Sequence, residues 1–429
     1  MSTEETTAAD GDPAAAEEPS HLLVSAPADG IPPVVDSPEA LDRAIAALRA
    51  GTGPLAVDTE RAQSYRYTAK AYLIQLRRTG SGTILIDPVA LEGGRERADL
   101  SELADATADA EWIIHAAQQD LPCLAEVDLL PRRLFDTELA GRLLGLPRVS
   151  LTALAERALG KTLAKEHSAA DWSKRPLPAD WLSYAALDVE LLIDLRDWVA
   201  AELEGAGKAE WARQEFAFLA DHAADPPVRR EDPWRRTSGI HDLRTPAQLA
   251  VVREVWETRD EIARRADRAP GRVLPDSAIS DLAARVTTQR PALGPDDLRA
   301  VRGFSWRIAA RYESSFLSAL DRVAGLSRGD LPPVSLSPDG PPPPRTWAKR
   351  FPDAFARWNR VRPATLALAE QFHLPVENLV SPDAVRRLAW EPPAEASTES
   401  VDAFLADRLV RPWQRELVVP LVTPLLAAD

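Results

Sequence analysis

The sequence predicts an α/β domain over residues 31–225, followed by two all-helical modules over 234–326 and 346–429. Before residue 225, short apolar runs typical of buried strands alternate with amphipathic helical patterns, as they do in α/β domains. After the stretch ADPPVRREDP (224–233), the apolar spacing is helical throughout. A run with seven prolines (331–345) then separates the two helical modules as a semi-rigid linker.

Composition bounds the class of protein. With 429 residues, 45% of them apolar, the chain can bury the cores of two or three domains. Its single cysteine, Cys123, excludes an intramolecular disulfide framework and a cysteine-based zinc site, and it fits a reducing cytosol. The chain has no run of 18 apolar residues and no basic-then-apolar N-terminal signal, so we expect a cytoplasmic protein without a membrane span.

Charge is unevenly distributed along the chain. The net charge of −15 is weak evidence against nucleic-acid binding. Residues 1–20 contain six acids and no Lys or Arg, so we expect a disordered acidic tail over 1–30. By contrast, 229–328 holds 19 Arg against 14 Asp and Glu. This basic excess fits a module that contacts phosphates, and it fits a solvated helical surface equally well.

The elements of the α/β domain follow from local patterns. A helix over 37–51 ends at Gly51, a strand follows over 54–60, and strands over 71–79 and 82–87 flank a Gly-Ser-Gly turn. The remaining predicted elements, in chain order, are a helix over 99–110, a buried strand over 111–117 that leads into a helix from Gln118, helices over 134–145 and 150–160, and one long helix over 178–205.

Helical periodicity continues in the C-terminal half of the chain. The stretch 245–268 places apolar residues at helical spacing, a second helix begins near 274, and Gly303 interrupts the helical pattern over 294–323. The linker, counted over 327–345, leads to a final helical module of similar length.

Two acids at the end of a predicted strand suggest a functional site. Asp58 and Glu60 in VDTE point to the same face, because side chains alternate along a strand. Two adjacent negative charges are unfavourable unless something positive lies between them. Oxygen ligands suit Mg²⁺ or Mn²⁺, so a divalent cation would turn the repulsion into attraction. Taken alone, the pair fits solvated acids at a strand end better than a metal site.

Further candidates lie downstream. Asp120 follows an apolar strand near a helix start, and Tyr184 and Asp188 lie at i and i+4 on one helix face. Singly, each has an ordinary structural interpretation: Asp120 as an acid in a first helical turn, Tyr184 as a core tyrosine and Asp188 as a surface acid. Asp136 looks like another exposed acid, which shows that a single carboxylate is weak evidence.

The order of these motifs resembles a known superfamily. Asp-x-Glu in a strand, His-x₄-Asp and then Tyr-x₃-Asp resemble the DEDD exonucleases of the tyrosine subtype; the histidine subtype would have His where Ser183 stands. The stretches VDTE, AYLIQL, LIDP, IIHAAQQDL, LFDTELAGRLLG, KEHSAADWSKRPL and YAALDVELL resemble ribonuclease D over 55–200. Residues 237–323 resemble its HRDC module, and 346–425 its second, more divergent HRDC-like module. The fold that this resemblance implies is an α/β ribonuclease H-like exonuclease domain followed by two all-α HRDC-like modules.

Two positions depart from the wider pattern. Ala116 stands where many superfamily relatives have Asn, but ribonuclease D members commonly have Ala there. Ala170 replaces the Ser or Thr that usually precedes Asp171-Trp172. Because position 170 is not a metal ligand, we expect little effect from this change.

The resemblance implies a mechanism and a substrate. It implies two-metal hydrolysis of RNA from the 3′ end, with Mg²⁺ or Mn²⁺. Asp58 would bridge the two metals, Glu60 and Asp188 would complete the ligands of the first metal, Asp120 would hold the second metal, and Tyr184 would orient the attacking water. The expected enzyme is a monomer that acts on the 3′ ends of structured RNA such as tRNA precursors. A 3′→5′ DNA exonuclease and a non-catalytic nucleic-acid-binding scaffold remain alternatives.

The HRDC-like modules would add contacts to the RNA backbone rather than read sequence. The arginines that suit such contacts include Arg264, Arg265, Arg268 and Arg272. The alternative is that this face packs against the nuclease domain.

Overall fold

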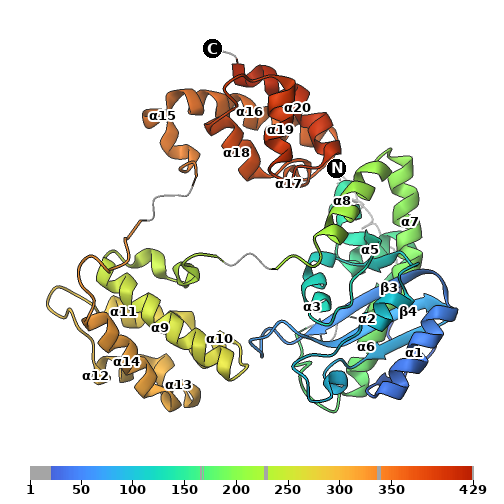
Figure 1. The fold of residues 1–429 in the computed structure, drawn as a ribbon, viewed down its shortest axis with the longest axis horizontal. Coiled ribbons are helices and arrows are strands. Elements are labelled where there is room, and N and C mark those ends of the chain that lie inside the picture. Colours follow the sequence, from blue (N-terminus) through green and yellow to red (C-terminus); the bar gives the residue numbers. More distant parts are fainter. Residues whose placement is uncertain (1–20, 165–166, 168, 227–229, 336–339, 428–429) are drawn as a thin grey trace, which may run out of the picture.

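The computed structural model describes residues 21–427, apart from 165–166, 168, 227–229 and 336–339. Figure 1 shows an α/β domain, coloured blue to green, followed by a central helical domain and a C-terminal helical domain. The predicted fold class is therefore confirmed. Most of the predicted acidic tail, residues 1–20, lies outside the described residues.

A six-stranded mixed sheet forms the centre of the α/β domain, with the strand order β2-β5-β4-β3-β6-β7. The pairs β3–β4 and β4–β5 are antiparallel, and the other three pairs are parallel. A separate two-stranded parallel sheet joins β1 to β8. The strands are β1 Leu22–Val24, β2 Val34–Val35, β3 Thr52–Arg61, β4 Ala71–Thr79, β5 Gly82–Ile86, β6 Trp112–Ile114, β7 Leu134–Asp136 and β8 Lys161–Leu163.

Two short strands correct the predictions. Leu22–Val24 forms β1 inside the predicted tail, because pairing with β8 orders this segment. Leu134–Asp136 forms β7 where only a helix over 134–145 was expected; the helix starts after it, at Thr137. Both strands have three residues and depend on a distant partner strand, so no local periodicity indicates them.

Helices cover both faces of the sheet (Figure 1). The predicted single helix over 178–205 is wrong: it divides at Leu191 into α6 and α7. No Gly or Pro marks this break; α6 packs on β3, β4 and β5, whereas α7 packs on α4, α5 and β6, so the two halves follow different surfaces. The helices of this domain are α1 Pro38–Ala50, α2 Ser101–Ala106, α3 Leu121–Ala125, α4 Thr137–Leu143, α5 Leu151–Leu159, α6 Ala179–Glu190, α7 Leu192–Gly205 and α8 Ala209–Asp221, with 3₁₀ turns η1 Ala90–Glu92 and η2 Ala117–Gln119.

Side chains along β3 alternate between the hydrophobic core on one face of the sheet and the two acids on the other face. Leu55 and Val57 join the hydrophobic core on one face of the sheet, where α1, α2 and α3 pack. Asp58 and Glu60 lie on the other face, which α6 covers. Register with β4 pairs Asp58 with Gln75 and Glu60 with Leu73. The strand therefore carries both acids on its α6 side, as the spacing predicted.

The two helical domains have their own cores. The central helical domain is built around α9 Pro246–Arg265, with α10 Pro270–Val273, α11 Asp276–Ala284, α12 Pro295–Arg299, α13 Arg307–Arg311, α14 Glu313–Ala324 and 3₁₀ turns Pro233–Arg236, Ile240–Asp242 and Arg302–Ser305. The C-terminal helical domain comprises α15 Trp347–Arg350, α16 Pro352–Gln371, α17 Val376–Leu379, α18 Pro382–Trp390, α19 Thr398–Ala406 and α20 Pro412–Ala427, after a 3₁₀ turn at Pro344–Thr346. Of the helices described, none is long and apolar enough to cross a membrane.

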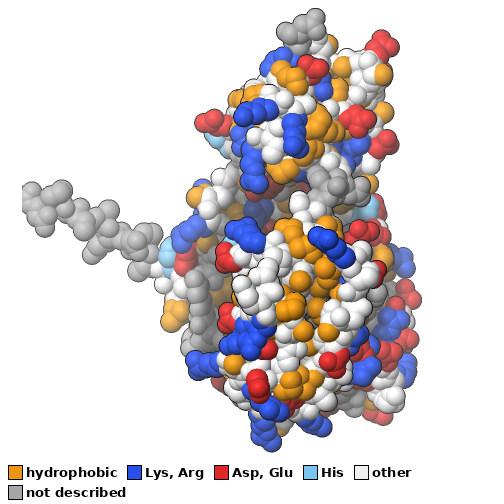
Figure 2. All heavy atoms as spheres, turned by 90° about the vertical axis from the view of Figure 1, so that its left-hand side faces the viewer, with side chains coloured by type: hydrophobic (Ala, Val, Ile, Leu, Met, Phe, Trp, Pro, Cys, Tyr) orange, Lys and Arg blue, Asp and Glu red, His pale blue; other side chains and the backbone are white. Residues whose placement is uncertain are grey.

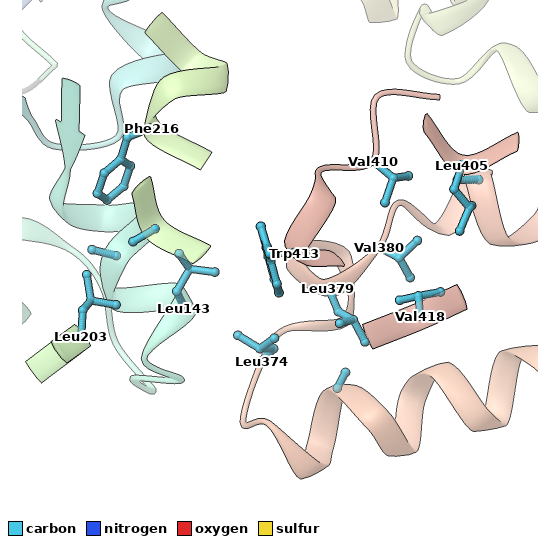
Figure 3. Packing of buried hydrophobic residues seen from close by; sticks show 14 of the residues in the cluster. Leu143, Leu203, Phe216, Leu374, Leu379, Val380, Leu405, Val410, Trp413 and Val418 are labelled. Carbon is cyan, nitrogen blue, oxygen red and sulfur yellow. The ribbon is translucent and has the colours of Figure 1, made fainter. Parts of the chain in front are cut away.

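The C-terminal helical domain shares a hydrophobic core with the α/β domain. Figure 3 shows Trp413 directed toward Leu143 and Phe216, between residues of the two domains. Its ring stacks on Trp211 with 4.7 Å between centroids, and its Nε1 donates to Glu215 Oε1 at 2.8 Å. Glu215 also accepts a bond from Arg411 at 2.7 Å. A buried, fully paired contact of this kind makes the two domains one packed unit.

The central helical domain contacts the α/β domain at the segment between β3 and β4. Asp267 Oδ1 accepts hydrogen bonds from the backbone N–H of Tyr67 (3.2 Å) and from both the N–H (3.1 Å) and hydroxyl (3.0 Å) of Thr68. Arg272 donates to the carbonyl oxygen of Ser64 at 2.6 Å and lies over the ring of Tyr65. This contact is polar and local, in contrast with the hydrophobic one made by the C-terminal helical domain.

Candidate active site

Three predicted site residues meet at the end of β3. Carboxylate oxygens of Asp58, Glu60 and Asp188 lie within 4.8 Å of one another, and we call these three residues the carboxylate cluster. Asp58 and Glu60 come from β3 and Asp188 from α6, which crosses that face of the sheet. The structure thus brings together residues that are 130 positions apart in the sequence.

Tyr184 lies one helical turn before Asp188 on α6. Its phenol lies beside Asp188, as the i, i+4 spacing allows, and burial together with the charge of Asp188 raises the pKa of the phenol. Tyr184 and the carboxylate cluster line one open cavity of about 760 Å³. The cavity is wide enough for a ligand larger than a metal ion.

Asp120 approaches β3 from its other edge. Beyond Ala56, β3 extends past its neighbour β6, which leaves that edge open to the turn at the start of α3. Thr59 Oγ1 donates to Asp120 Oδ1 at 2.6 Å, and Arg61 Nη2 lies 3.9 Å from the same oxygen. Asp120 lines a neighbouring cavity of about 460 Å³, to which Asp58 also contributes. Asp58 therefore stands between Asp120 and the rest of the carboxylate cluster.

The four acids of this site have raised pKa values, because they are buried close to one another. Burial raises the pKa of Asp120 to about 6 and the pKa of Asp188 to about 7. Burial, and then the charges of Asp120 and Asp188, hold the pKa of Asp58 well above its usual range. Burial and the charge of Asp58 raise the pKa of Glu60 in the same way. A nearby cation would reverse these shifts by favouring the ionised carboxylates.

The donor set fits a divalent cation. All four acids offer oxygen, which Mg²⁺ and Mn²⁺ prefer, and among the residues that the structure describes no nitrogen or sulfur ligand joins the carboxylate cluster. His115 lines the cavity, but burial lowers its pKa to about 4, and its Nδ1 is 2.9 Å from the hydroxyl of Thr137. His115 is therefore a neutral part of the wall.

Asp136, which looked like an exposed acid in the sequence, is buried. Its carboxylate accepts backbone N–H bonds from Ala116 (3.0 Å) and Ala117 (2.9 Å), and it caps α4 through Glu138 and Leu139. Ala116 has a positive φ of 60°, so this turn needs such support. Asp136 thus holds the turn between β6 and Asp120.

Thr59 and Arg61 are functional candidates that the sequence reasoning missed. Their side chains alternate with those of Asp58 and Glu60 along β3, so strand periodicity predicts that they point to the opposite face of the sheet. They bind Asp120, and Arg61 also donates to the carbonyl oxygen of Gln119. Together they attach the turn that carries Asp120 to the strand that carries the other acids.

Some of the arginines that were predicted to contact phosphates already make contacts within the protein. Arg272 contacts Ser64 and Tyr65, in line with the packing alternative, but it is exposed, so a phosphate contact there stays a prediction. Arg264 and Arg265 are exposed and pair with Glu261. Figure 2 shows Lys and Arg side chains spread among acidic ones over the visible face, beside a strip of hydrophobic side chains. A surface of mixed charge gives weaker attraction to phosphates than the arginine count suggests.

Comparison with known families covers most of the chain. Residues 32–204 match the family described as 3′-5′ exonuclease, 248–320 match the HRDC domain, and 340–426 match the family described as 3′ to 5′ exonuclease C-terminal domain. A ribonuclease D of Nitrobacter hamburgensis is 30% identical over 277 residues, which span 64% of this chain and 68% of the relative. A ribonuclease D of Desulfotalea psychrophila is 28% identical over 280 residues, or 64% and 71% of the two chains.

Solved structures share the whole arrangement. A protein from Bifidobacterium adolescentis superposes with a TM-score of 0.84 at 37% identity, covering 95% of this chain and 100% of the other. Escherichia coli RNase D has the same fold, with a TM-score of 0.64 at 23% identity over 92% and 98% of the two chains. The cluster geometry, the matched domains and the relatives agree, and the chain therefore belongs to the ribonuclease D family of 3′→5′ exoribonucleases.

Proposed function

We propose that the protein trims the 3′ ends of structured RNA, tRNA precursors in particular, by removing one nucleotide at a time. The observation that carries this proposal is the convergence of Asp58, Glu60, Asp188 and Tyr184 on one open cavity, with Asp120 beside it. The substrate class is supported by Escherichia coli RNase D, which has the same fold and is described as an exoribonuclease involved in structured RNA processing. We also propose that the protein is a cytoplasmic monomer.

Each acid has a proposed role. Asp58, Glu60 and Asp188 would hold one Mg²⁺ or Mn²⁺ ion, and Asp58 with Asp120 would hold a second. When bound, such ions neutralise charge that develops on the phosphodiester and lower the pKa of a bound water. The four carboxylates would hold the ions and keep them apart. Thr59 fixes the Asp120 carboxylate through its 2.6 Å hydrogen bond.

Tyr184 orients the attacking water in this proposal. Burial and the negative charge of Asp188 raise the pKa of its phenol above the ordinary value. A phenol that keeps its proton near neutral pH donates a hydrogen bond and does not act as the general base. Tyr184 is therefore assigned a positioning role toward the water, beside the carboxylate cluster.

We propose that the chain divides functionally into the nuclease domain (31–225, together with β1), the HRDC domain (234–326) and the second HRDC-like domain (346–429), with 327–345 as linker. The C-terminal domain contributes to the nuclease core, and the central domain contacts the segment that follows Glu60. Exposed arginines such as Arg264 and Arg265 remain candidates for phosphate contact, whereas Arg272 supports the interdomain contact.

The test gives the 429-residue protein matched RNA and DNA substrates and compares their cleavage. Purified protein is incubated with a 3′-extended tRNA precursor and with DNA of the same sequence, in Mg²⁺ or in EDTA. We expect stepwise shortening of the RNA, little shortening of the DNA, and no product in EDTA. Asp58→Asn should abolish activity, and Asp194→Asn, an exposed acid on α7, should not change it. Equal or faster cleavage of DNA would favour the DNA exonuclease, and full activity of Asp58→Asn would overturn the site assignment.

A further inference from the structure

Trp306, in the central helical domain, is an exposed tryptophan to which the proposed mechanism gives no role. The chain has 12 tryptophans; all the others are buried or half-buried, whereas Trp306 is 43% exposed. A single exposed apolar residue is ordinary when its surroundings are ordinary. The surroundings of Trp306 are not, because exposed arginines lie on both sides of it in the sequence.

These arginines belong to a run without acids. Residues 299–311 contain four arginines and no Asp or Glu, in a chain whose net charge is −15. Within the described part of the chain, Arg299 pairs with Glu313 at 2.8 Å and no ion pair involves the other three. All three are exposed, and together with Trp306 they form what we call the Trp306 patch: Arg302, Arg307 and Arg311.

The local fold fixes the backbone of the Trp306 patch. The 3₁₀ turn Arg302–Ser305 ends at Trp306, and α13 begins at the next residue. Gly303 is buried in this turn, where a Cβ atom would collide with Ala278 of α11, so the turn packs closely on that helix. Arg307 and Arg311 lie at i and i+4 on α13, where like charges repel each other. A bound phosphate would turn this repulsion into attraction.

The Trp306 patch lies next to the part of the central domain that contacts the nuclease domain. Helix α13 packs against α10, and Arg272 of α10 contacts Ser64 and Tyr65. Ser64 and Tyr65 line a cavity of about 170 Å³ together with Glu60 of the carboxylate cluster. Helix α10 therefore stands between the patch and the segment that follows the active-site strand, so an RNA strand bound at the patch lies on the nuclease side of the central domain.

We propose that the Trp306 patch binds single-stranded RNA: the indole of Trp306 stacks on an unpaired base, and the three arginines contact the flanking phosphates. The inference rests on the proposed function, because the strand in question is the RNA whose 3′ end is trimmed. An aromatic ring stacks on any base, so the contact tolerates every sequence, as an enzyme that removes successive nucleotides requires. The guanidinium groups supply the charge that phosphates attract, and each can donate two parallel hydrogen bonds to one phosphate.

RNA binding is measured in EDTA, so that the RNA stays intact and the readout does not depend on catalysis. The 429-residue protein is titrated into a 5′-labelled single-stranded RNA and followed by fluorescence anisotropy. For Trp306→Leu we expect affinity to fall about 10-fold, because the stacked base loses its partner. Trp306→Phe keeps an aromatic ring and should stay within about threefold of the wild type. A fully paired RNA duplex offers no unpaired base, so its affinity should be the same for Trp306→Leu and the wild type.

The arginines are tested through the salt dependence of binding. In a variant that combines Arg307→Gln and Arg311→Gln, the slope of log affinity against log salt should become shallower by about 0.7 for each lost phosphate contact. Arg328→Gln, which changes an exposed arginine beyond α14, is the matched control and should leave the slope as it is. All these positions are exposed, so we expect each variant to fold.

The outcomes separate this inference from the proposed function. Wild-type affinity of Trp306→Leu for the single strand, or an equal loss on the duplex, would overturn the stacking role of Trp306. An unchanged salt slope in the arginine variant would overturn the phosphate contacts. If the wild type binds the single strand through Trp306 but does not shorten it in Mg²⁺, the proposed nuclease activity fails while the binding site is supported.

Discussion

Thr59 Oγ1 and Asp120 Oδ1, which belong to residues 61 positions apart, are joined by a buried hydrogen bond of 2.6 Å. The bond attaches the start of α3 to the strand that carries Asp58 and Glu60. Without it, Asp120 would depend on Arg61, whose guanidinium is 3.9 Å away, and on the turn that Asp136 supports. The position of the fourth acid therefore depends on a hydroxyl that the carboxylate pattern did not reveal.

Thr59→Val should weaken the site without removing an acid. Loss of the buried donor costs about 1–3 kcal/mol and leaves the Asp120 carboxylate less well held. We expect the Mg²⁺ concentration that gives half-maximal exonuclease activity to rise, and stability to fall. Activity is measured against Mg²⁺ concentration, together with thermal unfolding. Thr59→Ser retains the hydroxyl and should behave like the wild type; the same loss in Thr59→Ser would argue against the hydrogen bond as the cause.

Asp188→Asn should stabilise the metal-free protein while it abolishes activity. The pKa of Asp188 is about 7 in the folded chain, against about 3.9 for an ordinary Asp. Between these values the folded state binds more protons than the unfolded state, so the free energy of unfolding falls as pH rises from about 4 to 7. Asn cannot ionise, so the free energy of unfolding of Asp188→Asn does not show this fall. In EDTA at pH 7.5 we expect a melting temperature higher by about 2–4 °C for each kcal/mol gained, and no difference at pH 4.

The control for this experiment is Asp194→Asn, an exposed acid on the next helix, which should not change the melting temperature at either pH. A wild-type protein that is more stable than Asp188→Asn in EDTA at pH 7.5 would contradict the predicted charge strain.

Tyr184→Phe should reduce the rate and leave metal binding intact. The phenol lies in the cavity wall beside Asp188, but it is no ligand in the proposed site. Loss of a group that orients a reacting water lowers the turnover rate by about 100-fold. Single-turnover cleavage and Mn²⁺ titration separate the two effects. Lost Mn²⁺ binding in Tyr184→Phe would show that the phenol supports the metal site instead.

Asp267→Ala should loosen the central helical domain. The variant loses three hydrogen bonds that Tyr67 and Thr68 make to one carboxylate oxygen, and each bond to a charged group contributes about 1.5–3 kcal/mol at most. We expect faster proteolysis in the segment that links the two domains, about tenfold slower trimming of a tRNA precursor, and unchanged cleavage of a dinucleotide.

Asp281→Ala, an exposed acid on α11, is the matched control for this variant. Equal losses on the precursor and on the dinucleotide would show that Asp267 acts on the nuclease site and not on domain placement.

The sequence predicted the parts of the site that follow from short-range rules. Period-two alternation placed Asp58 and Glu60 together, and i, i+4 spacing placed Tyr184 beside Asp188. The meeting of these pairs with Asp120 was expected only from the resemblance to ribonuclease D. The confirmed fold class rests on the same combination of local patterns and family motifs.

Other features depend on contacts between distant segments and had no local signal. Strand β7 exists because β6 lies beside it, and the break at Leu191 follows from two different packing surfaces. Asp136 looked exposed because its buried surroundings come from the turn at Ala116. In the sequence Arg272 looks like any other surface arginine. Its hydrogen bond to the loop at Ser64 exists only in the folded chain. Periodicity describes one element at a time, so it cannot report such partners.

The core shared by the α/β domain and the C-terminal helical domain has a consequence for synthesis on the ribosome. Phe216 and Trp413 pack into the same cluster, but about 200 residues separate them, and translation at about 5–20 residues per second takes about 10–40 seconds to cover that distance. During this interval the nascent chain presents the apolar surface of α4, α7 and α8 without its cover. The central helical domain emerges in between, so the shared core is completed only after α20 leaves the exit tunnel.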